Sequence, residues 1–129
     1  MDNKALIQEA IEAKKNSYSP YSNFAVGAAL LCKDGKIYRG CNIENGAYPT
    51  SMCAERVALF KAVSEGERDF IGIAIVSSSG EITPPCGACR QALSEFVNGD
   101  FKVILAKNQD EYKTYDFAEL LPLSFKLEK

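Results

Sequence analysis

Hydrophobic positions along this chain follow two different patterns, a helical period and continuous apolar runs. In residues 3–16 they recur every three or four positions, which predicts an amphipathic helix capped by Asp2 or Asn3. Residues 71–76, Ile-Gly-Ile-Ala-Ile-Val, contain no polar side chain, and residues 101–106 are almost as apolar. Such continuous apolar runs are typical of central strands that are buried on both faces.

Two further strand-like runs, residues 24–32 and 36–42, are joined at Asp34-Gly35. Because Asp-Gly favours a two-residue type I′ turn, we expect these runs to be antiparallel neighbours. The pattern also predicts helices at residues 52–64 and 87–97, a short edge strand at 112–115, and a last helical turn that starts at Asp116 with a capping contact from Glu119. Alternating helices and strands of this kind predict an α/β fold, namely a three-layer α-β-α sandwich around a mixed five-stranded sheet.

The length of 129 residues suits a single domain that covers residues 1–129. The first residues lack the layout of a signal peptide, and no apolar run approaches the roughly 20 residues that span a bilayer. We therefore expect a cytoplasmic protein with no membrane partner. The net charge is −2 and the basic residues are scattered, which argues against a nucleic-acid partner and favours a small uncharged substrate.

Cysteine and histidine counts narrow the possible chemistry. The chain has five cysteines and no histidine. An odd number of cysteines in a cytoplasmic protein points to metal binding or catalysis rather than to a disulfide framework. Without histidine, a metal ion must be held by thiolates, carboxylates or both. Cys32 and Cys41 lie in strand-like runs and are expected to be core thiols.

The other cysteines lie in two short motifs, Cys53-Ala54-Glu55-Arg56 and Pro85-Cys86-Gly87-Ala88-Cys89-Arg90-Gln91. Each motif is placed at a predicted helix start, where free N–H groups favour thiolate over thiol. If the two helix starts lie side by side, three thiolates converge and leave a fourth position for water, as in a catalytic zinc site. A carboxylate at Glu55 could reach that water without binding the metal.

Three other interpretations of these motifs stay open. Cys86-x-x-Cys89 alone could be a redox pair, although this leaves Cys53 and Glu55 unexplained. The three cysteines could form a closed structural zinc site with Cys41 as the fourth ligand. A zinc-stabilised interaction module would have the same ligands and no use for the carboxylate.

The order Cys-x-Glu followed by Pro-Cys-x-x-Cys is the known signature of zinc-dependent deaminases. With Phe-Ala-Val-Gly-Ala-Ala-Leu (24–30), Gly-Cys-Asn-Ile-Glu-Asn (40–45) and Leu-Leu-Pro-Leu-Ser-Phe (120–125), it makes the chain resemble the small homotetrameric cytidine deaminases over nearly its whole length. The resemblance implies hydrolytic deamination of cytidine and deoxycytidine in pyrimidine salvage. It also implies a homotetramer with one Zn²⁺ per subunit.

The same resemblance assigns a role to each matching position. Cys53, Cys86 and Cys89 would be the zinc ligands and Glu55 the proton shuttle, with Arg56 bonded to the ligand sulfurs. The substrate-binding positions would be Phe24 at the pyrimidine, Asn42 and Glu44 at the ribose 3′-hydroxyl, Tyr48 and Phe125, which reach a neighbouring subunit, and Ala54.

The alternative is a related zinc deaminase with another aminopyrimidine substrate, such as blasticidin S, a free base or a nucleic acid. The Asn42 and Glu44 pair argues for a substrate that contains ribose. A tRNA adenosine deaminase would be expected to have histidine in place of Cys53.

Overall fold

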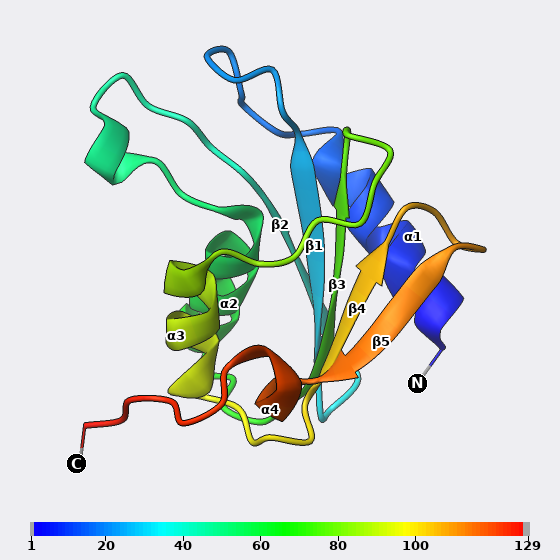
Figure 1. The fold of residues 1–129 in the computed structure, drawn as a ribbon, viewed down its shortest axis with the longest axis vertical. Helices are drawn as coiled ribbons and strands as arrows, with labels where there is room; N and C mark the ends of the chain where they lie inside the picture. Colours follow the sequence, from blue (N-terminus) through cyan, green and yellow to red (C-terminus); the bar gives the residue numbers. More distant parts are fainter. Residues whose placement is uncertain (1, 128–129) are drawn as a thin grey trace.

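The computed structural model describes residues 2–127 and arranges them around one five-stranded sheet (Figure 1). The elements in chain order are α1 (Asn3–Lys14), β1 (Val26–Cys32), β2 (Ile37–Cys41), the 3-10 helix η1 (Tyr48–Thr50), α2 (Ala54–Ser64), β3 (Phe70–Ser77), α3 (Gly87–Ser94), β4 (Lys102–Ala106), β5 (Tyr112–Asp116) and α4 (Phe117–Leu120). The strand order is β2-β1-β3-β4-β5, in which β3 and β4 are parallel and the other neighbours antiparallel. Helix α1 covers one face and α2 and α3 cover the other, so the predicted three-layer sandwich is confirmed.

Helix α1 closes its face of the sheet with a small, wholly apolar core. Leu6, Ile7 and Ala10 pack against side chains of β1, β3 and β4. The Asp2 carboxylate accepts hydrogen bonds from the backbone N–H groups of Lys4 and Ala5 at 3.1 and 3.2 Å, so Asp2 is the residue that caps the helix.

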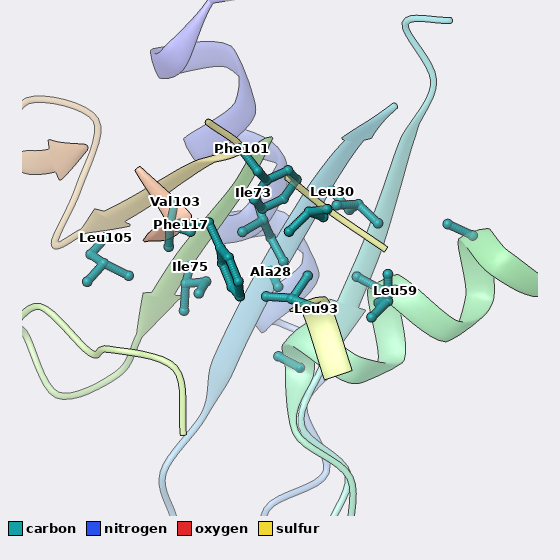
Figure 2. Packing of buried hydrophobic residues seen from close by; sticks show 14 of the residues in the cluster. Ala28, Leu30, Leu59, Ile73, Ile75, Leu93, Phe101, Val103, Leu105 and Phe117 are labelled. Atoms are coloured by element: carbon teal, nitrogen blue, oxygen red, sulfur yellow. The ribbon is translucent and has the colours of Figure 1, made fainter. Parts of the chain in front are cut away.

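The opposite face holds a larger core beneath α2 and α3 (Figure 2). Leu30 and Ile73, from β1 and β3, pack in one cluster with Leu59 of α2 and Leu93 of α3. Burial of each such side chain contributes about 1.5–3 kcal/mol. This packing fixes both helices on the sheet and thereby brings their first turns close together.

The spacing between α2 and the sheet is set by Gly40 in β2. A Cβ atom at this position would lie 2.2 Å from the backbone oxygen of Ala54 and 2.5 Å from the backbone nitrogen of Ala58. The backbone of α2 therefore rests directly on the strand, and no larger residue fits between them.

The hairpin between β1 and β2 differs from the prediction in its turn. The strands are antiparallel neighbours as expected, but the loop has three residues, closed by hydrogen bonds from Cys32 N–H to Lys36 O (2.9 Å) and from Gly35 N–H to Cys32 O (3.0 Å). A type I′ turn needs two residues with positive φ, whereas only Gly35 has one, at 94°. The Asp34 side chain instead accepts from the Lys36 N–H at 2.9 Å. The predicted two-residue type I′ turn is therefore wrong.

The other boundaries agree to within a few residues. Helix α3 stops at Ser94, three residues before the predicted end, and the 45–51 loop contains the unpredicted turn η1. The capping contact at α4 is present, since the N–H of Asp116 donates to Glu119 Oε1 at 2.9 Å. In the part of the chain that the structure describes, we find no helix with the length and apolar character of a membrane span.

Candidate metal centre and active site

The cysteines of the two motifs meet between the starts of α2 and α3. Cys53 and Cys86 immediately precede these helices, and Cys89 lies in the first turn of α3. Their sulfur atoms all lie within 4.8 Å of one another, with 3.7 Å between Cys53 and Cys86 and 3.4 Å between Cys86 and Cys89. All three are free cysteines, so the cluster offers three separate thiol ligands.

The spacing of these sulfur atoms suits a tetrahedral zinc ion. Zn–S bonds of about 2.3 Å at tetrahedral angles separate two sulfur atoms by about 3.8 Å, close to the distances found here. Cys41 is not part of the cluster among the residues that the structure describes. Three thiols with no fourth protein ligand match an open, catalytic site better than a closed, structural one.

Two of the thiols, Cys53 and Cys89, hold their protons unequally. A hydrogen bond from Cys89, supported by one from Arg56, lowers the pKa of Cys53 to about 5 although the residue is partly buried. Cys89 retains its proton as the donor in that bond and is buried, and both effects raise its pKa. The Cys53 thiolate is therefore ready at neutral pH, and a divalent cation would displace the proton that Cys89 retains.

Arg56 supplies positive charge next to the sulfur atoms. Its Nη2 donates to the sulfur of Cys53 at 3.4 Å, while its buried Nε has no hydrogen-bond partner in the described part of the chain. Three thiolates and Zn²⁺ carry a net charge of −1, which an adjacent guanidinium offsets. A partly buried guanidinium with one unsatisfied buried donor fits an anionic ligand set at this position.

Glu55 lies beside the cysteines in the first turn of α2 and is only 5% exposed. Burial raises the pKa of its carboxyl group above the ordinary value. The side chain borders a cavity of about 200 Å³ that is also lined by Phe24, Asn42, Ala54 and two of the three cysteines. A carboxyl group with a raised pKa is better suited to accept and return a proton than one with an ordinary pKa.

The side chain of Asn42 makes hydrogen bonds within the fold and retains one N–H donor that these bonds do not use. Its side-chain oxygen accepts from the Val26 N–H at 2.9 Å and from the Ser17 hydroxyl, and its amide group donates to Phe24 O at 2.7 Å. A carboxamide has two N–H donors, so one N–H remains available at the cavity.

Glu44 borders a second cavity, of about 440 Å³, together with Tyr21 and Tyr48. Its carboxylate accepts from the N–H groups of Tyr21 and Ser22, at 3.0 and 3.1 Å, and from the Ser22 hydroxyl. The Ser22 hydroxyl is the main cause that lowers the pKa of Glu44, and the two N–H groups add to it. A carboxylate has about four acceptor positions, so one remains for a ligand.

Tyr48 and Phe125 do not border the cavity at the cysteines. Tyr48 is 74% exposed, in η1, and its ring meets the ring of Tyr21 edge to face at 6.4 Å. Phe125 is 66% exposed, and its backbone oxygen accepts a hydrogen bond from Gln91 at 2.8 Å. Within one chain, these two side chains are separate from the metal centre.

The structure adds cavity residues that the sequence analysis missed. Thr83 and Pro84 line the wall next to Cys86, and the Thr83 hydroxyl lies 2.6 Å from that of Ser77 at the end of β3. The Pro-Pro pair before Cys86 is a signal that could have marked this wall, since a rigid segment next to a ligand restricts its position.

Comparisons with known proteins agree with this geometry. The family profile described as "Cytidine and deoxycytidylate deaminase zinc-binding region" matches residues 1–106. The chain is 52% identical over 128 residues to a cytidine deaminase of Halalkalibacterium halodurans, covering 99% of this chain and 97% of that protein. A probable cytidine deaminase of Dictyostelium discoideum is 43% identical over 131 residues, covering 98% of this chain and 88% of that protein.

Solved structures give the same result. A crystal structure of cytidine deaminase from Burkholderia pseudomallei superimposes with a TM-score of 0.91 at 44% identity, covering 97% of this chain and all of that one. Cytidine deaminase from Mycobacterium tuberculosis follows with a TM-score of 0.87 at 35% identity, covering 98% and 99%. With a family profile over most of the chain and close relatives over its full length, this protein belongs to the cytidine and deoxycytidylate deaminase family.

Proposed function

We propose that this enzyme hydrolyses cytidine and deoxycytidine to uridine and deoxyuridine with release of ammonia. The observation that carries the proposal is the meeting of three thiols and the buried carboxyl group of Glu55 at one cavity. The relatives named above support cytidine as substrate, and they give no support to blasticidin S.

Cys53, Cys86 and Cys89 would hold one Zn²⁺ per subunit, with Arg56 offsetting the excess negative charge of the thiolates. When bound, zinc supplies an activated water molecule, because it lowers the pKa of water from 15.7 toward about 7. The remaining steps are the work of this chain's own residues.

Glu55 carries protons between water and base. It accepts a proton from the attacking water and delivers it to ring N3 while the C4–O bond forms and the C4=N3 double bond opens. It then moves the proton of the new C4 hydroxyl to the exocyclic amine. The C4–N bond breaks, ammonia leaves and a C4 carbonyl remains.

The two cavities suit the two parts of a nucleoside. The cavity at the cysteines has about 200 Å³, below the roughly 300–1,000 Å³ typical of drug-sized ligands, and would take the pyrimidine beside Phe24 and Ala54. The spare N–H of Asn42 and the spare acceptor position of Glu44 together match one hydroxyl group, which both donates and accepts. This pair would hold the 3′-hydroxyl of the sugar.

The assembly we propose is a homotetramer in which Tyr48 and Phe125 reach the site of a neighbouring subunit. Both rings are largely exposed in one chain, and exposed aromatic side chains are enriched at interfaces between subunits. We further propose that residues 1–129 form one domain, that the enzyme is cytoplasmic and that it acts in pyrimidine salvage.

The function is tested by the ultraviolet change on mixing zinc-loaded protein with cytidine, deoxycytidine, cytosine or blasticidin S. We expect conversion of both nucleosides alone, and loss of about 10²–10⁴-fold in kcat in the variant Glu55→Gln with its zinc retained. Full activity of that variant, or no conversion of either nucleoside by protein with bound zinc, would overturn the proposal.

Subunit exchange tests the roles of the neighbouring chain. Phe125→Ala retains Glu55, and Glu55→Gln retains Phe125, so a mixed tetramer regains complete sites only if Phe125 serves another subunit. We expect co-expressed variants to be more active than either alone. Activity no higher than the sum of the separate variants would contradict this role of Phe125.

A further inference from the structure

Arg90 links two parts of the chain that are far apart in sequence. It follows Cys89 on α3, and its guanidinium donates from Nε to Pro85 O at 2.9 Å and from Nη1 to Leu120 O at 2.8 Å. The next residue, Gln91, donates to Phe125 O at 2.8 Å. Helix α3 therefore carries the candidate metal-ligating thiols at its start and, directly after them, two side chains that hold Leu120 and the C-terminal segment that follows it, residues 121–127. This segment passes the helix in Figure 1.

Each of the two carbonyl groups lies close along the chain to a residue of the candidate site. Pro85 directly precedes Cys86, and its neighbour Pro84 lines the cavity. Leu120 is the last residue of α4, from which the chain continues to Phe125. The planar guanidinium of Arg90 thus joins the residue next to the cavity wall, Pro85, to the residue that directly precedes the C-terminal segment, Leu120.

We propose that Arg90 is a positioning residue that couples the metal-ligating start of α3 to the docking of the C-terminal segment. The proposal deepens the proposed function and rests on it for the roles of the cysteines and of Phe125. When Cys86 and Cys89 are fixed, the Pro85 carbonyl and the guanidinium are fixed with them, and the Leu120 carbonyl gains a rigid donor. Because such coupling is reciprocal, a docked C-terminal segment also favours retention of the metal.

Arginine is required for this link because its donors lie in one rigid plane and point in different directions. A lysine ammonium at the same position could reach one carbonyl but could not hold two in a fixed relation. Glutamine removes the charge and one of the two donor groups.

The chain also contains a matched control. Arg68 likewise donates to two backbone carbonyls, Val63 O at 2.9 Å and Glu67 O at 2.8 Å, but these bonds join it to the end of α2 and the loop after it, and neither reaches α3 or the C-terminal segment. Arg68→Gln therefore removes the same kind of contact away from the site.

The test compares zinc-loaded wild-type protein with the variants Arg90→Gln, Arg90→Lys and Arg68→Gln. The readouts are the rate of zinc release to a chromogenic chelator, hydrogen exchange of the amides in residues 121–127, and kcat and KM for cytidine. For Arg90→Gln we expect zinc release about 10-fold faster and kcat/KM about 10–100-fold lower, with faster exchange in the C-terminal segment. Arg90→Lys is expected to fall between this variant and the wild type, and Arg68→Gln to match the wild type.

Coupling adds one further expectation. Chelation of zinc should accelerate exchange of residues 121–127 in the wild type, and should add nothing in Arg90→Gln, where the link is already broken. A change in zinc release without a change in exchange, or the reverse, would overturn the proposal, as would wild-type behaviour of Arg90→Gln. If Arg90→Gln does not fold, Arg90→Lys decides by the same criteria. Zinc release and exchange require no turnover, so failure of the proposed reaction is recognised separately.

Discussion

The two halves of the candidate site are built in different ways. The metal half consists of Cys53, Glu55, Arg56, Cys86 and Cys89, placed by two helix starts over the larger core. The substrate half consists of Glu44, Tyr21 and Tyr48, which border the larger cavity, and of Asn42, which borders the cavity at the cysteines. A single chain brings together all residues of the metal half. The substrate half, in contrast, has unused hydrogen-bonding groups and exposed aromatic rings, which are available to a ligand or to another subunit.

The largest effect should come from removing a thiol of the metal half. We expect Cys89→Ser to lose zinc and all measurable deaminase activity, because only two thiols remain to hold the ion. Metal content and the ultraviolet assay measure the two losses. Cys32→Ser is the matched control, since Cys32 is equally buried but lies in β1 away from the three cysteines. Retention of activity in Cys89→Ser would mean that this thiol is not a ligand.

A change in the substrate half should leave zinc bound and weaken substrate recognition. We expect Glu44→Gln to raise KM for cytidine about 10-fold, because a hydrogen bond to a charged group is weakened. The same variant should treat 2′,3′-dideoxycytidine like the wild type does, since that probe lacks the hydroxyl that Glu44 would hold. Glu9→Gln, which disturbs only an ion pair with Arg39, serves as the control. Equal effects on both nucleosides would contradict the assignment.

The cavity wall next to Cys86 should show a smaller effect. Thr83→Val retains the side-chain shape and removes the hydroxyl bonded to Ser77, which keeps Ser79 as a partner at 2.8 Å. We expect a loss of about 1 kcal/mol in the free energy of unfolding and a modest rise in KM. Urea unfolding and steady-state kinetics provide the measurements. An unchanged KM would remove this wall from substrate positioning.

The smallest effect concerns the pH dependence of stability through Glu44. Its pKa is lowered in the folded chain by the Ser22 hydroxyl and neighbouring N–H groups. The stabilisation is therefore present above the unfolded pKa of about 4.3 and is lost as pH falls through the lower, folded value. The difference in unfolding free energy between wild type and Ser22→Ala, both treated with chelator, should be constant from neutral pH to about pH 5 and shrink below about pH 4. A difference that does not depend on pH would contradict this account.

The same contrast explains what the sequence could predict. The metal half could be located because its candidate ligands lie in the Cys-x-Glu and Pro-Cys-x-x-Cys motifs that zinc-dependent deaminases share, at helix starts where the spacing brings Cys86 and Cys89 to one side. The apolar runs predicted β3 and β4 because central strands contact core on both faces.

The substrate half and several loop details depend on contacts between distant segments. The bond between Ser77 and Thr83, the bracing of the 17–26 segment by Asn42, and the hold of Arg90 on Leu120 O all arise from how loops return to the sheet. The turn at Gly35 was mispredicted because the Asp-Gly pair fits a three-residue loop as well as a two-residue one.

The close packing of α2 against Gly40 affects how variants at this position should be interpreted. It lies inside a strand and borders neither the cavity at the cysteines nor the cavity at Glu44, yet its missing side chain sets the distance between β2 and the helix turn that contains Ala54. A substitution there would displace the segment that connects Cys53 to Glu55 as well as loosen the core. A mutational scan that scores cellular abundance would therefore underestimate the damage at this position, and a parallel scan for growth on cytidine would reveal it.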